Sequence, residues 1–397
     1  MYLKKTNYSV LFLIVSMSPL LSLLFDNTTF YNYLAPIIAI ILCMISIFEG
    51  KVVNILFVFL SIFSLLIGLF NSVDSGKIYI HFFPFINTVL LFLLFSDVKV
   101  IERFKIFFKK YKLLLISELL VIWIVEFILI LTHKGYMYRF SWGGSFFLGT
   151  SQMPHTLAYL MMMTIIIFLC VLINDRKRFP YYFILFIPFL AIYLSGARVV
   201  LLAALGISLI LIDYLFTSRS RSIMLKLFVF FLITMIFLFI FRKNIINSNL
   251  WQKMMLRENS GNNSAGRLYM IKYMIPQFLS DSNLLHILFG QGDDKTYLYN
   301  LENIYVASPV WAHDDLLQVL IGKGIMGLLV YMYSFLRYIK FVFSNNSKYI
   351  EIILSGVIVI LLLINGFYTY RDASLGIPFI SLLLILYNGR GDESKNV

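Results

Sequence analysis

The sequence is poor in charged residues and in cysteine. Only 13% of its 397 residues are charged, whereas about a quarter are charged in a typical soluble domain. Because 60% of the residues are hydrophobic, the chain cannot bury its apolar surface in one aqueous core, which excludes a soluble globular protein. The two cysteines, Cys43 and Cys170, fall inside apolar runs. They are expected to be small buried side chains rather than a disulfide or a metal site.

The alternation of polar and apolar residues that marks membrane β-strands is also lacking. The apolar runs are instead continuous and about twenty residues long, the length that a membrane-spanning helix needs. No signal-peptide cleavage pattern follows the first run. Twelve such runs predict an all-α, polytopic integral membrane protein, with segments near 8–25, 30–48, 52–70, 78–96, 111–132, 155–174, 180–196, 198–216, 223–241, 316–336, 350–369 and 373–388.

The connections between these runs suggest how the chain is organised. The seventh and eighth runs are joined only by SGAR (195–198), which forms either a tight hairpin or a break in one helix. The one long connection is 242–315. We therefore expect nine helices in 1–241, a long loop in 242–315 and three helices in 316–397, all in one membrane domain.

The net charge of +13 is best explained by membrane topology, without any nucleic-acid partner. If the N-terminus is cytoplasmic, that side receives twenty of the Lys and Arg residues, while the opposite short loops hold five. Short cytoplasmic loops carry an excess of Lys and Arg. This bias predicts that both termini are cytoplasmic and that 242–315 is extracytoplasmic.

Two arginines could bind an anion at the outer face. Arg198 follows a glycine at a helix junction, and a planar guanidinium can bind phosphate oxygens in a fork. Arg267 lies near the start of a short amphipathic run that Ser264 could cap, where helix N–H groups also favour anions. Arg257 lies ten residues upstream. The alternatives are an interfacial Arg198 and solvated loop charges for the others.

The stretch LFGQGDDK and the later WAHDD carry further polar groups. Gly290 and Gly292 are a weak turn signal. The paired aspartates at 293–294 and 314–315, together with His313, could hold Mg²⁺ or Mn²⁺. Asp314 and Asp315 could instead open the helix that follows, which we favour because carboxylates stabilise helix N-termini. His313 can act as a general base near neutral pH.

Several stretches resemble, in order, motifs of the O-antigen ligase and polymerase family. RFSWGGSF and MPHTLAYL resemble its arginine loop and Pro-Asn-x-x-Ala helix start, with His155 in place of Asn. YLSGARVVLLAAL resembles its Ser-Gly-x-Arg helix. SAGRLYMIKYMIPQF, LFGQG and AHDDLLQVLIGKGIMGLLVYMY resemble its arginine segment, Gly-x-Gly turn and His-Asn helix, with Asp314 in place of Asn. The resemblance covers roughly residues 135–335.

This resemblance implies a GT-C-like membrane glycosyltransferase of the bacterial cytoplasmic (inner) membrane. It would polymerise undecaprenyl-pyrophosphate-linked oligosaccharide repeats, as donor and acceptor, into O-antigen or capsular-type polysaccharide. Implied partners are membrane lipid, a chain-length regulator and a flippase, with no metal or other cofactor. By position, Arg198 and Arg267 would bind pyrophosphate and His313 would work at the acceptor. Substrate binding would fall to Arg139, His155, Arg257, Gly290, Gly292 and Asp314.

Two other functions remain open from the sequence. A ligase of the same family would transfer the finished chain to a different acceptor, and no motif separates it from a polymerase. A flippase or other transporter is a different class, and Glu118 and Glu126 in the fifth run could form its proton path. Transporters usually contain internal repeats, and we find none in this sequence.

Overall fold

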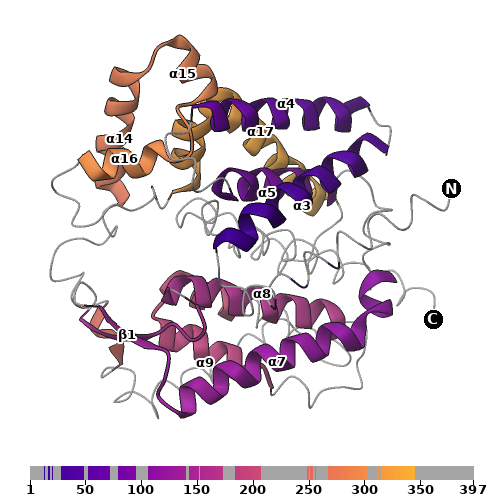
Figure 1. Ribbon diagram of the computed structural model, residues 1–397, viewed down its shortest axis with the longest axis vertical. Helices are drawn as coiled ribbons and strands as arrows, with labels where there is room; N and C mark the ends of the chain where they lie inside the picture. Colours follow the sequence, from indigo (N-terminus) through magenta and orange to yellow (C-terminus); the bar gives the residue numbers. More distant parts are fainter. Residues whose placement is uncertain are drawn as a thin grey trace. The chain divides into compact units, whose positions relative to one another are not determined.

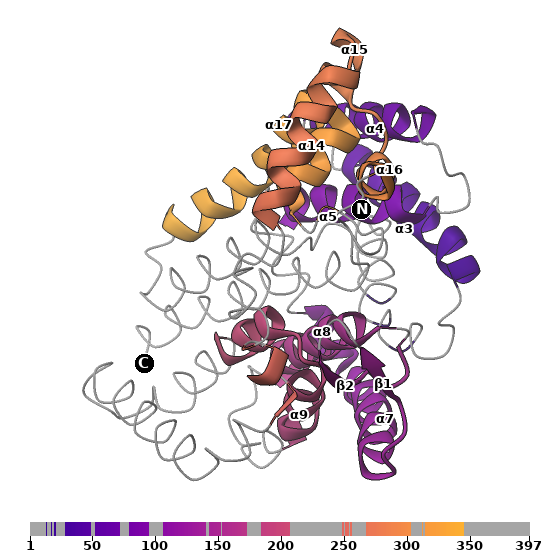
Figure 2. The same ribbon diagram turned by 90° about the vertical axis from the view of Figure 1, so that its left-hand side faces the viewer.

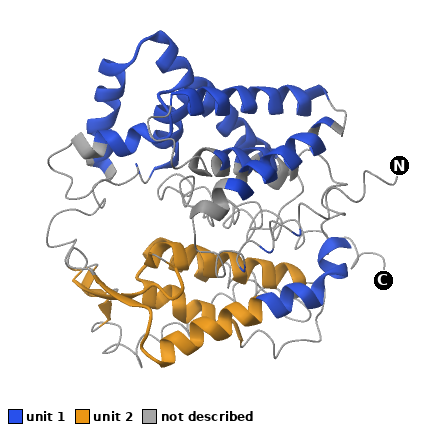
Figure 3. Cartoon of the chain, viewed as in Figure 1, with its two compact units in different colours: residues 1–118, 266–397 blue, residues 119–265 orange. Residues whose placement is uncertain are grey.

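The computed structural model describes about half of the chain. The described residues are 28–48, 52–71, 79–94, 106–139, 143–151, 153–172, 184–206, 248–249, 251–253, 255, 267–302, 312 and 314–344, with residues 13, 17 and 20. The predicted helices near 223–241, 350–369 and 373–388, and most of 8–25, lie outside this part. The chain divides into two compact units, 1–118 with 266–397 and 119–265, which are described separately (Figure 3).

Unit 1 contains three N-terminal helices that pack on one another. They are α3 (Thr28–Phe48), α4 (Val52–Phe70) and α5 (Tyr79–Leu94). Helix α3 lies alongside α5, and both contact α4 (Figures 1 and 2). Helix α4 buries Phe57, Val58 and Leu65 and exposes Phe59 and Phe63 on other faces. Such one-sided burial with an apolar exterior suits a helix that faces lipid.

The second part of unit 1 comes from the far end of the chain. Helices α14 (Arg267–Asp281), α15 (Leu284–Phe289) and α16 (Lys295–Glu302) precede the long helix α17 (Asp315–Ser344). Helix α17 packs against α4 and α5 as well as against α14, α15 and α16 (Figures 1 and 2). In its described part the expected long loop thus contains α14, α15 and α16, and a buried cluster that includes Met274, Phe278 and Tyr299 joins α14 and α16 to α17.

Unit 2 contains most of α7 (Lys112–Leu131), followed by α8 (Pro154–Leu172) and α9 (Phe186–Ser195). Between α7 and α8 lies an antiparallel hairpin of β1 (Tyr136–Arg139) and β2 (Gly144–Phe147), with Arg139 opposite Gly144. Helix α8 is buried along almost its whole length. A hydrogen bond of 2.9 Å from the Trp123 indole N–H to the Thr164 hydroxyl ties α7 to α8.

Four described helices are long and apolar enough to cross a membrane: Val52–Phe70, Lys112–Leu131, Pro154–Val171 and Asp315–Arg337. Helices α3, α4, α5, α7 and α8 begin and end within two residues of their predicted bounds. The described part is mostly helical, as expected, but a short hairpin lies at the stretch that resembles the arginine loop. The protein is a mostly helical membrane protein.

Candidate functional site

Helix α17 is broken at Gly324. This residue has φ 65° and ψ −169°, which no residue inside an α-helix adopts. The Tyr331 hydroxyl donates to the Asp315 carboxylate over 3.2 Å, although sixteen residues of straight helix would separate them by about 24 Å. The two halves of α17 must therefore fold toward each other at Gly324. The predicted helix over 316–336 is therefore present but interrupted at Gly324.

The Gly290–Gly292 turn fills the break. The last carbonyls before a helix end lack partners within the helix. Here the N–H groups of Gln291 and Gly292 donate to the carbonyls of Ile321 and Gly322, over 2.8 and 3.0 Å. Gly290 has φ 87°, and a Cβ there would collide with the Gly322 carbonyl. The weak turn signal in the sequence therefore marks a close approach between two backbones.

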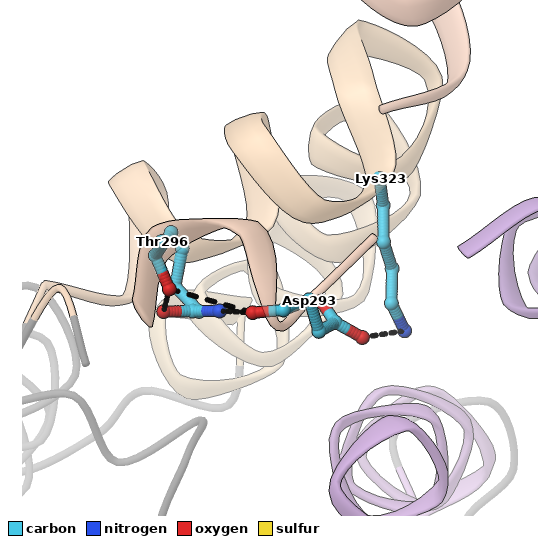
Figure 4. A network of polar contacts seen from close by, with 4 residues as sticks. Asp293, Thr296 and Lys323 are labelled. Atoms are coloured by element: carbon cyan, nitrogen blue, oxygen red, sulfur yellow. Dashed lines mark hydrogen bonds and ion pairs between the residues drawn. The ribbon is translucent and has the colours of Figure 1, made fainter. Parts of the chain in front are cut away.

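A buried ion pair lies beside this turn. The Lys323 ammonium, one residue before the break, is 3.9 Å from the Asp293 carboxylate, and the two side chains are 7% and 1% exposed (Figure 4). The Asp293 carbonyl accepts from the Gln318 amide, and the Gln318 oxygen accepts from the Thr296 hydroxyl over 2.8 Å. A buried charge is costly unless it is paired and hydrogen-bonded. This network therefore holds α16 and the turn against α17.

The cavity beside Lys323 is too small for a substrate. Its volume is about 20 Å³, which is room for about one water molecule. It is lined by Ser61, Ser64, Phe85, Thr88, Lys323, Gly327, Val330 and Tyr331. A sugar or a pyrophosphate does not fit there, so we treat the break in α17 as a scaffold rather than as the donor site.

Of the two functions considered for the Asp314–Asp315 pair, the structure shows helix capping for Asp314. Its carboxylate accepts from the Leu317 N–H over 2.9 Å at the start of α17. Asp315 is fully buried and accepts from Tyr331 instead. Among the residues that the structure describes, no group of three or more His, Cys, Asp and Glu side chains is placed to share a metal ion.

A second helix interruption carries Arg198. Helix α9 ends at Ser195, Gly196 adopts a left-handed conformation with φ 69°, and helix resumes at Arg198. The buried Lys253 ammonium donates to the Gly196 carbonyl over 3.2 Å and lies 5.2 Å from the centre of the Phe146 ring. A Cβ on Gly196 would come within 2.5 Å of that same ring. The turn before Arg198 is thus fixed from two sides.

The start of the long connection is attached to the hairpin of unit 2. The Asn249 amide donates to the Ser145 carbonyl of β2, and a Cβ on Gly144 would lie 2.8 Å from the Asn249 side-chain oxygen. Partial burial raises the pKa of the Tyr136 phenol, which belongs to β1 of the same hairpin. Arg198 itself is half-buried, and no described carboxylate pairs with it.

The remaining predicted site residues are placed only in part. Arg139 is the last residue of β1, His155 is the half-buried second residue of α8, and Arg267 is the first residue of α14. Arg257 and His313 lie outside the described residues. Met270 of α14 and Ala312, which precedes His313, share one buried cluster. The structure therefore brings the helix that begins at Arg267 together with the start of α17.

Three buried polar residues at these two interruptions were not predicted from the sequence. Lys323, Gln318 and Lys253 are 6%, 0% and 2% exposed. The lysine inside GKGIMG, within an apolar run, was the available signal for the first, because an intramembrane charge is functional or paired by default. Nothing in the local sequence distinguishes Lys253 or Gln318 from an ordinary polar residue.

These features define a membrane protein whose helices are interrupted at glycines beside buried basic residues. Residues 183–332, which include both interruptions, match the family model described as O-antigen ligase. The predicted resemblance to the O-antigen ligase and polymerase family is thereby confirmed. Comparison with curated proteins and with solved structures gives no match.

Proposed function

We propose that this protein is a polysaccharide polymerase of the cytoplasmic membrane that joins polyprenyl-pyrophosphate-linked repeat units at the outer face. The observation that carries this proposal is the family match over 183–332. That segment contains Arg198, Arg257, Arg267 and His313, the charged residues that the motifs single out. The topology with twelve helices, two cytoplasmic termini and an extracytoplasmic site belongs to the same proposal.

The proposed reaction needs charge neutralisation more than bond activation. The acceptor hydroxyl attacks the anomeric carbon of the donor sugar, and the bond from that carbon to the pyrophosphate oxygen breaks. The electron pair leaves with the lipid pyrophosphate, and the hydroxyl proton passes to His313. Fixed positive groups aimed at the developing charge stabilise such a transition state. Arg198 and Arg267 would supply them without a metal ion.

Two local features support the anion-binding role of these arginines. Arg198 follows a fixed glycine turn and has no described carboxylate partner. Arg267 begins α14, and the first N–H groups of a helix lack partners within it and attract anions. Arg139, His155 and Arg257 would contact the oligosaccharide, and the Gly290–Gly292 turn and Asp314 would shape the site.

A ligase is the second candidate, because the matched family model is described by that activity. Polymerase and ligase perform the same bond exchange with different acceptors. A polymerase adds repeats one after another and yields a ladder of products. A ligase yields transfer of an existing chain to a lipid or protein acceptor without lengthening it. The product pattern therefore separates the two.

The transporter alternative receives no support from the two buried glutamates of α7. The Leu20 N–H donates to Glu118 over 3.2 Å. The Thr150 hydroxyl and N–H donate to Glu126 over 2.6 and 3.2 Å. These bonds fasten an N-terminal segment and the loop before α8, so each carboxyl has a structural role within its own unit.

The test is formation of a polymer ladder in cells that lack the native gene and carry His313→Ala. We expect turnover to fall by roughly 10²–10⁴, the usual contribution of a general base, with unchanged protein level. Arg267→Ala should also abolish the ladder. A normal ladder from His313→Ala would remove the proposed base. Transfer of preformed chains without a ladder in the unmodified protein would make it a ligase.

A further inference from the structure

Gln318 is a fully buried amide in the first half of α17, and it uses both ends of its side chain. Its oxygen accepts from the Thr296 hydroxyl over 2.8 Å and from the Ala312 N–H over 3.4 Å. Its amide nitrogen donates to the Asp293 carbonyl. A buried amide that lost these partners would carry the full cost of desolvation. The three bonds therefore fix the surrounding chain at three residues in two segments.

The partners of Gln318 belong to two segments that are distant in sequence. Thr296 lies in α16, and Asp293 lies in the turn just before that helix. Ala312 immediately precedes His313 and is fully buried in the cluster that joins α14 to α17. On the other side of His313, Asp314 is fixed by its bond to Leu317. The chain is thus held on both sides of the proposed base by the first turns of α17.

The buried ion pair anchors this arrangement at its other end. Asp293, whose carbonyl accepts from Gln318, contacts Lys323 through its carboxylate (Figure 4). Lys323 lies at the break in α17, where the Gly290–Gly292 turn bonds to the helix carbonyls. A continuous set of polar contacts therefore runs from the break to the residue before His313.

We infer that Gln318 is a positioning residue for the proposed glycosyl transfer, and that it holds Ala312, the residue before His313, in register with α16. This inference rests on the proposed function. The neighbouring buried positions Leu317, Val319 and Ile321 are all apolar, so packing alone does not require an amide here. Misplacement of a catalytic group by about 1 Å can cost on the order of a hundredfold in rate, and three directed bonds prevent such movement.

The test measures turnover and apparent KM with purified protein in lipid nanodiscs. The probe is the lipid-linked repeat unit extracted from membranes of cells that lack this gene. Gln318→Met keeps the length of the side chain and removes all three bonds. We expect kcat to fall about tenfold or more, while KM changes by less than about twofold because the arginines are untouched. Ser334→Ala is the matched control, since Ser334 is a buried residue of α17 beyond the break, and among the described residues its hydroxyl bonds only the Tyr331 carbonyl.

The same substitution in a His313→Ala background separates positioning from general stability. If Gln318 acts through His313, Gln318→Met costs less than about twofold there, because effects of residues that act as a unit are not additive. Equal losses in both backgrounds would show that Gln318 acts elsewhere and would overturn the inference. A fully active His313→Ala single variant would overturn the proposed base instead, whatever Gln318→Met does.

Gln318→Glu provides a second variant in case Gln318→Met does not fold. With its carboxyl protonated at this fully buried position, it keeps an oxygen that can accept from the Ala312 N–H and from Thr296, and a hydroxyl replaces the amide donor to the Asp293 carbonyl. We expect kcat within about threefold of the unmodified protein, since the contact beside the base persists. A tenfold loss in a Gln318→Glu protein with a normal melting temperature would contradict the positioning role.

Discussion

The two helix interruptions share one backbone feature but differ in whether the neighbouring basic residue has a carboxylate partner. Both occur at a glycine with positive φ, Gly324 in unit 1 and Gly196 in unit 2, and both have a basic residue within two positions. At Gly324 the basic residue is Lys323, and the protein supplies its counter-charge from Asp293. At Gly196 the basic residue is Arg198, for which no carboxylate partner occurs among the described residues. A compensated charge stabilises the fold, whereas an uncompensated one is available to an anionic ligand.

The largest effect should come from breaking the compensated interruption. Asp293→Ala leaves the Lys323 ammonium buried without its carboxylate, and we expect a loss of about 3–5 kcal/mol of stability. The double variant Asp293→Leu with Lys323→Met should recover most of it, because no charge remains buried. Thermal unfolding in detergent measures both. Lys340→Met, at an exposed lysine of the same helix, is the control and should change the melting temperature little. An unchanged melting temperature for Asp293→Ala would disprove the pairing.

The next effect concerns the fit of the turn into the break. Gly290→Ala combines a positive φ with a collision against the Gly322 carbonyl, and should cost about 2–4 kcal/mol. Gly68→Ala is the matched control. A Cβ there lies 3.8 Å from that same carbonyl, which is an ordinary contact. The melting temperature of Gly290→Ala should therefore be clearly lower than that of Gly68→Ala. Equal values would show that the turn shifts to accommodate the added Cβ.

Substitution of Arg198, at the interruption in unit 2, should change activity and not stability. Arg198→Lys keeps the charge and loses the planar fork, so we expect at least a tenfold loss of turnover, about 1.4 kcal/mol of transition-state binding. The melting temperature should stay unchanged. Arg337→Lys, at an arginine of α17 that lies over the Phe92 and Tyr333 rings, controls for the exchange itself. Full activity of Arg198→Lys would make Arg198 an interfacial charge only.

The smallest effect tests the cap that starts the first half of α17. Asp314→Ala removes the acceptor for the Leu317 N–H and should cost about 1 kcal/mol. Asp314→Asn keeps a capping oxygen and should be close to neutral in thermal unfolding. If Asp314→Asn were as destabilising as Asp314→Ala, the negative charge rather than the hydrogen bond would be what matters at this helix start.

Much of the helical framework was predictable because membrane-spanning helices are specified by one local property. A continuous apolar run of about twenty residues has few alternatives in lipid, and α4 has the predicted bounds, 52–70. The hairpin was missed because YMYR and GSFF are strands of only four residues each, too short for a periodic signal. The start of α14 at Arg267 was predicted from its polar lead and amphipathic pattern.

The polar contacts at the interruptions could not be predicted, because they join residues that are distant in sequence. Asp293 and Lys323 are thirty residues apart. The apolar setting of Lys323 suggests that it is paired, but nothing local identifies Asp293 as its partner. The break at Gly324 could not be predicted from the sequence either, because glycines are common in continuous membrane helices. For the site, the motifs indicated Arg198, Arg267 and the Gly290–Gly292 turn, but not the residues that hold them in place.

The bonds from the Gly290–Gly292 turn to α17 also determine how this segment exchanges hydrogen with water. The amides of Gln291 and Gly292 lie outside any helix, yet they are buried and donate to the carbonyls of Ile321 and Gly322. Amides exchange quickly in mobile loops and slowly where opening requires global unfolding. These two loop amides should therefore be protected from deuterium as strongly as the core of α17, and should exchange only when the turn separates from that helix.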